Sequence, residues 1–249
     1  MNDTTHNPES LLDVAAMPGD HPLKQLSTTT VSALYDLDTV SEKAERITTD
    51  FAAKVKADRD LTQAAKARKI AELASQHAEA IQAVLTAVDN VPKAALAHMN
   101  RLQAVDPLPK GDADARAADE ERRAALRTMP DKDRSRLLAE ARAGKNPSVA
   151  AAVLRGDSWL SGASPEDFAA IHARALVHRH RDTLMLLSEA KTHAVRARID
   201  AQKTLDRMAS LAGASKGALT VANRELPAER MLTDKLMALR PYLEASANG

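Results

Sequence analysis

The sequence predicts an all-α protein: a long antiparallel helical hairpin, similar to a coiled coil, with a small helical module at its tip. Three observations support this fold class. The 249 residues are 44% hydrophobic but only 2% aromatic, so alanine supplies much of the apolar surface. Helix-forming residues dominate, and only 8 glycines interrupt them. Two long stretches, residues 39–106 and 164–212, repeat apolar residues at the helical period.

The first 38 residues have a different composition from the rest of the chain. Lys24 is their only basic residue, against six acidic ones, and Pro8, Pro18 and Pro22 interrupt any regular pattern. This segment carries too little apolar surface to offset the entropy of ordering it. We therefore expect residues 1–38 to form an acidic, flexible arm.

Residues 39–106 are expected to form the first long helix. Thr39 is a suitable cap, and apolar residues then recur three and four positions apart. Large apolar residues become sparse between residues 55 and 70. We interpret this as a shift of the apolar face around one continuous helix. Pro92 predicts a kink or a restart of that helix.

Residues 107–163 are expected to form the small module, because short helical patterns alternate there with proline and glycine. Asn146 is a suitable cap for one of these helices, with Pro147 in the first turn. Trp159 is expected to anchor the core of the module. The alternative is that Trp159 is an exposed anchor for a partner protein, because tryptophan is enriched at binding hot spots.

The second long helix is expected over residues 164–212, followed by a linker and a short helix in residues 213–249. Ser164 is a suitable cap, and Asp167 stands where it can complete a capping box. A helix of this length is about 70 Å long and needs a partner along it. The first long helix, running antiparallel, is the predicted partner, and a compact multi-helix bundle is the alternative.

Overall charge and composition exclude several classes of protein. With 35 basic and 34 acidic residues, the net charge of +1 gives no global attraction to nucleic acid or to an anionic membrane. The chain has no cysteine, its start lacks the basic and apolar regions of a signal peptide, and no apolar run could span a membrane. We expect a cytoplasmic protein.

No motif predicts catalysis, a cofactor or a metal. The run Gly156-Asp157-Ser158 is similar to part of a serine-hydrolase motif, but it follows a helix rather than a strand. Four histidines fall on the second long helix, and none of their spacings is the three or four that places two ligands on one face. We therefore expect a protein that is not an enzyme.

The second long helix is locally basic between residues 174 and 203, with seven basic residues against three acidic ones. This makes nucleic acid a candidate partner, although the basic residues do not keep to one face and no aromatic residue is interleaved to stack on a base. A solvated helix exterior and docking of the acidic arm are the alternatives. The candidate contacts are Arg174, Arg179, Arg181, Lys191, Arg196 and Arg198.

Other protein subunits are the preferred partners. An alanine-rich seam buries little area, so the predicted hairpin needs further apolar contacts, either with itself or with another protein. The candidate interaction residues are Trp159, Leu160, Leu186, Met231, Leu232 and Leu236.

One segment resembles a known group of proteins. Residues 135–180, which include the run NPSVAAAVLRGDSWLSGASPEDF and the start of the basic helix, look like uncharacterised helical proteins encoded in the structural and head-gene regions of tailed bacteriophages and prophages. The resemblance lies in helix punctuation and transfers no functional residue. It implies a structural or assembly role. A regulatory or anti-defence protein that binds a host protein or nucleic acid is the alternative.

Overall fold

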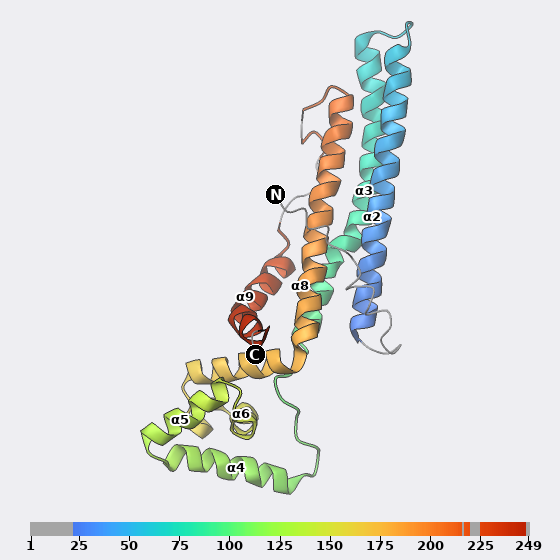
Figure 1. The fold of residues 1–249 in the computed structure, drawn as a ribbon. Coiled ribbons are helices and arrows are strands. Elements are labelled where there is room, and N and C mark those ends of the chain that lie inside the picture. Colours follow the sequence, from blue (N-terminus) through green and yellow to red (C-terminus); the bar gives the residue numbers. More distant parts are fainter. Residues whose placement is uncertain (1–21, 216, 220–224, 248–249) are drawn as a thin grey trace. The chain divides into compact units, whose positions relative to one another are not determined.

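The computed structural model describes residues 22–215, 217–219 and 225–247 of the chain. These residues form eight α-helices and no strand, which confirms the all-α class (Figure 1). The helices are α2 (Pro22–Ala57), α3 (Gln63–Met99), α4 (Ala113–Thr128), α5 (Asp131–Arg142), α6 (Pro147–Leu154), α7 (Ser158–Ser161), α8 (Pro165–Leu211) and α9 (Pro227–Ala247).

The chain divides into two compact units. The first, called the bundle unit, consists of the described residues within 1–98 and 186–233, and the second, called the small unit, consists of those within 99–185 and 234–249. The long helix α8 contributes to both. Its backbone departs from helical angles at His180, where φ is −127° and ψ is 27°.

The flexible arm was predicted too long. Residues 1–21 lie outside the described part of the chain, but residues 22–38 belong to helix α2 rather than to a flexible arm. The side chains of Thr30, Ala33 and Leu37 are buried there. The segment folds because these residues repeat at helical spacing and reach an apolar partner surface, so its acidic residues can stay at the exterior.

The prediction of one helix over residues 39–106 is wrong. Helix α2 ends at Ala57, and α3 begins at Gln63 and runs back along it (Figure 1). The Oδ1 of Asp58 accepts a hydrogen bond from the amide of Asp60 at 2.9 Å. The hydroxyl of Thr62 caps α3 by accepting one from the amide of Ala65 at 3.2 Å. The thinning of the apolar stripe therefore marks a turn and not a shift of the seam.

Helices α2, α3 and α8 pack together in the bundle unit, which also includes the first turns of α9. The Nε of Arg198 in α8 pairs with Asp89 in α3, while Thr48 of α2 contacts both His77 and Met208. Residue numbers therefore rise along α3 as they fall along α8, so these two helices are antiparallel. Helix α2 lies parallel to α8.

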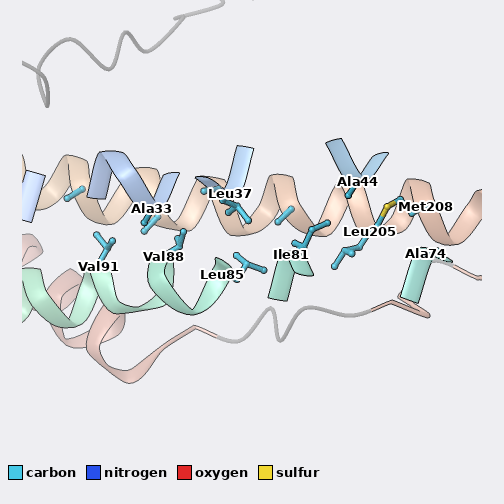
Figure 2. Packing of buried hydrophobic residues seen from close by; sticks show 14 residues of the cluster. Ala33, Leu37, Ala44, Ala74, Ile81, Leu85, Val88, Val91, Leu205 and Met208 are labelled. Carbon is cyan, nitrogen blue, oxygen red and sulfur yellow. The ribbon is translucent and has the colours of Figure 1, made fainter. Parts of the chain in front are cut away.

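The core of the bundle unit combines large and small side chains (Figure 2). Helix α3 contributes Ile81, Leu85 and Val88, all fully buried. Helix α8 contributes Leu205 and Met208 together with a row of buried alanines: Ala190, Ala194, Ala197 and Ala201. Small residues let helix axes approach closely, so the larger chains of the neighbouring helices can fill the space beside them.

The small unit has its own core, built from α4, α5, α6 and the first turns of α8. Its buried members include Leu126, Leu138, Val153 and Ile171. Local caps set its helices as the sequence predicted. Asn146 accepts a hydrogen bond from the amide of Val149 with Pro147 in the first turn. The hydroxyl of Ser164 accepts one from the amide of Asp167 and donates one to its carboxylate, each at 3.0 Å.

Two helices contain an internal proline, and the predicted restart at Pro92 does not occur. Helix α3 continues through Pro92 and ends at Met99, short of the predicted end at residue 106. Helix α9 likewise continues through Pro241. A proline inside a helix removes one backbone hydrogen bond, a loss that contacts made by the surrounding helix can offset. Burial of Pro92 is consistent with such compensation.

Candidate protein interaction site

Helix α7 presents Trp159 to solvent. The chain's single tryptophan is 68% exposed, so the prediction that it anchors the core of the small unit is wrong. The apolar core is instead filled by residues of α4, α5, α6 and α8. The periodicity of so short a helix gave no indication of which side faces inward.

The turn that carries Trp159 is well fixed. Helix α7 packs against α4 and α6 through its other side. The side chain of Ser161 is fully buried, and its hydroxyl donates to the carbonyl of Ser158 at 2.9 Å. Gly162 ends the helix with φ of +66°, a left-handed conformation that glycine adopts without strain. A bulky aromatic group is therefore held outward on a structured support.

The neighbouring candidates are less exposed. Leu160 is half-buried, as is Leu186 on α8. Around Leu186, Leu184 and Leu187 are fully buried and Met185 is exposed. Leu160 thus extends the apolar area beside Trp159 within the small unit.

The three candidates on α9 do not form one exposed face. Met231 is 52% exposed, but Leu232 is fully buried and Leu236 is 8% exposed. The prediction that Leu232 and Leu236 are available to a partner is therefore wrong, because α9 turns these leucines toward its own chain. Met231 keeps an outward position because it lies about 100° around the helix axis from Leu232.

Arg198 is a buried structural residue and not a surface contact for nucleic acid. Its side chain is 5% exposed and is paired with two carboxylates. The Nε donates to Asp89 of α3 at 3.1 Å, and Nη1 donates to Glu229 of α9 at 3.0 Å. Because the side chain of Glu229 is only 10% exposed, this cluster is largely desolvated. It joins α3, α8 and α9.

The other basic candidates have varied surroundings. Lys191 donates to the hydroxyl of Thr233 at 3.1 Å, and Arg179 pairs with the carboxylate of Asp106. Arg174 and Arg181 are half-buried, and Arg196 is exposed. The described structure therefore does not align these six side chains as one continuous basic stripe.

A second group of charges lies on the surface of the bundle unit. The Nε and Nη2 atoms of Arg207 donate hydrogen bonds to the carboxylate of Glu45, at 2.5 and 2.7 Å. Hydrogen bonding to Glu45 raises the pKa of Arg207. Desolvation raises the pKa of the nearby Asp38, and the charge of Asp200 adds to the effect. Glu45 and Arg207 help to set the parallel register of α2 and α8.

The described residues offer no group of three or more histidine, aspartate and glutamate side chains that could hold a metal ion. Residues 156–158 form the junction between α6 and α7, so Ser158 starts a short helix rather than following a strand. No helix within the described ranges is long and apolar enough to cross a membrane.

Comparison of the chain with known protein families, with curated proteins and with solved structures found no match.

Proposed function

We propose that the chain is a non-enzymatic structural or assembly protein that acts through contacts with other protein subunits. The observation that carries this proposal is the outward position of Trp159 on a fixed turn. A buried core is where a lone tryptophan is expected, since its removal from water is strongly favourable. Exposed tryptophan on a rigid support is typical of the centre of a protein interface.

Further features support the same class of function. Met185 and Met231 are also exposed, and methionine adapts well to the surface of a partner. The large buried side chains fill the cores of the two units, and the outer faces of the helices remain exposed to solvent. The resemblance noted in the sequence of residues 135–180 supports proposing this role in a virion or in head assembly. Capsid or portal genes beside the gene for this chain would support that placement.

The alternative of a nucleic-acid binder has less support. Arg198 is committed to Asp89 and Glu229, and Arg179 and Lys191 have partners within their own units. Each of these cations would have to leave its partner to contact phosphate, which reduces the net gain.

Substitution of Trp159 tests the proposal. Trp159→Ser removes the aromatic anchor, and hot-spot residues of this kind contribute about 2 kcal/mol or more to association, so we expect complex formation to weaken about thirtyfold or more. Light scattering over a range of concentrations measures self-association, and pull-down against candidate virion proteins measures binding to other partners.

Tyr35→Ser is the matched control, because Tyr35 is an exposed aromatic residue of the bundle unit. It should leave association through Trp159 unchanged, and both variants should keep the helical circular dichroism spectrum. A wild-type chain that stays monomeric at high concentration and binds no virion or host protein would overturn the proposal.

A further inference from the structure

An irregular segment of the small unit lines a pocket and is held in place by side chains of neighbouring elements. The segment, called the strap, covers residues 102–110 between α3 and α4. The Nε2 of His180 donates to the carbonyl of Gln103 at 2.9 Å, and the Nε of Arg155 donates to the carbonyl of Asp106 at 2.9 Å. The carboxylate of Asp106 pairs with Arg179, and this hydrogen bond lowers the pKa of Asp106. The strap therefore has a defined path.

The pocket that the strap helps to line has a volume of about 600 Å³. That size falls within the range of small-molecule sites, roughly 300–1,000 Å³. The strap, α4, the end of α6 and α8 all contribute to its walls. Its lining includes three apolar and three basic side chains: Leu102, Leu108, Leu154, Lys110, Arg116 and His172.

The charges around this pocket do not balance locally. Arg155 donates from Nη1 to the buried carboxylate of Asp119 at 3.0 Å, and Arg122 pairs with the same carboxylate. Asp106 pairs with Arg179, so both carboxylates already have cationic partners. Lys110 and Arg116 differ. Within the described part of the chain, neither side chain forms a hydrogen bond or an ion pair, which leaves two cations at the pocket without carboxylate partners.

His172 adds a neutral polar group. Desolvation lowers the pKa of its imidazole below the usual value of 6.5, which favours the neutral ring at pH 7, and the residue is exposed to solvent. A neutral imidazole can donate one hydrogen bond to an anion. The wall therefore offers two cations and one neutral donor beside an apolar surface.

We propose that this pocket binds a small organic anion, with its carboxylate or phosphate group held by Lys110 and Arg116 and its apolar body on Leu108 and Leu154. The chemistry follows from the lining. Unpaired cations attract an anionic group, and arginine presents a fork that matches carboxylate and phosphate oxygens. A purely inorganic ion would leave the apolar wall in water, and an uncharged ligand would leave the cations unused.

Titration calorimetry at low ionic strength tests the proposal with four compounds and the full chain. Phenyl phosphate and phenylacetate carry an anionic group on an apolar ring, whereas phenol lacks the charge and inorganic phosphate lacks the ring. We expect saturable binding of at least one ring-bearing anion, and the stronger of the two identifies the preferred group. Phenol and inorganic phosphate should bind at least about tenfold more weakly.

Variants locate the binding. Lys110→Gln combined with Arg116→Gln should weaken binding of the ring-bearing anion about tenfold or more. Lys132→Gln combined with Arg136→Gln removes the same charge from exposed positions on α5, outside the pocket lining, and should have little effect. Leu108→Ser should weaken phenyl phosphate more than inorganic phosphate.

Three results would overturn the proposal. They are no binding of either ring-bearing anion at millimolar concentration, equal losses in the two double variants, and binding of phenol or inorganic phosphate as tight as that of the ring-bearing anions. All four substituted residues lie on the exterior, so circular dichroism of both double variants should match that of the wild type. A negative result in this ligand-binding experiment does not affect the association test of Trp159, because the two experiments use different residues and different partners.

Discussion

At the scale of single residues, Arg198 shows how one buried charge ties helices together. Its carboxylate partners are Asp89 of α3 and Glu229 of α9, whereas Arg198 itself belongs to α8. Desolvating a guanidinium costs several kcal/mol, and the attraction of the carboxylates offsets that cost only while both contacts persist. The cluster therefore contributes mainly by fixing how these helices meet.

Loss of the guanidinium should be strongly destabilising. Arg198→Ala leaves Asp89 and Glu229 without their buried cation, so we expect the free energy of unfolding to fall by about 3–5 kcal/mol. The control is Arg196→Ala, which removes the same type of side chain from an exposed position on the same helix and should change the stability by no more than about 0.5 kcal/mol. Urea titration followed by circular dichroism measures both. Equal effects of the two substitutions would contradict the assigned role of the cluster.

The sequence could not distinguish Arg198 from Arg196. Both lie in the same basic stretch of α8, and the partners that bury Arg198 are 31 and 109 positions away in the chain, beyond the reach of helical periodicity. For Trp159 the difficulty is similar. Apolar character predicted burial, but a four-residue helix has too few turns for its pattern to say which side packs inward.

At the scale of elements, two helix starts were predicted from their capping residues. The pairs Ser164 with Asp167, and Asn146 with Pro147, have local geometry that depends on neighbours within one turn. The turn after α2 was missed because residues 58–62 contain no glycine or proline. Its signals, an aspartate turn and the cap at Thr62, are common inside long helices too.

The cap at Thr62 is expected to contribute measurably to the hairpin of α2 and α3. Thr62→Ala removes the acceptor for the amide of Ala65 and should lower the free energy of unfolding by about 1 kcal/mol. Thr62→Ser keeps the hydroxyl and should have an effect near zero. Thermal and urea unfolding monitored at 222 nm compare the three proteins. If serine and alanine are equally destabilising, the hydroxyl does not cap α3.

At the scale of the whole molecule, the alanine row of α8 explains why a third helix is present. Two helices joined along Ala190, Ala194, Ala197 and Ala201 bury little area per turn, and each Å² of apolar surface removed from water contributes only about 25 cal/mol. Helix α2 supplies the missing burial through Ala33, Leu37 and Ala44, which join the same core cluster. The expected two-helix seam is therefore part of a three-helix core.

The two units have separate cores, so damage to one core should act first on its own unit. Leu85→Ala empties space in the core of α2, α3 and α8, and Leu138→Ala does so in the core of the small unit. Both leucines are buried, and such truncations cost about 2–5 kcal/mol.

Hydrogen exchange measured by mass spectrometry can follow each unit separately. In Leu85→Ala, exchange should rise in α2, α3 and residues 186–211, with little change in α4 to α6. In Leu138→Ala, the increase should appear in α4 to α6 and the first turns of α8. Local opening has this pattern when cooperative units coincide with separately packed cores. Helix α8 passes through both units, so it is the path by which one core can affect the other. A uniform increase across all helices in either variant would show that α8 couples the two units into one cooperative fold.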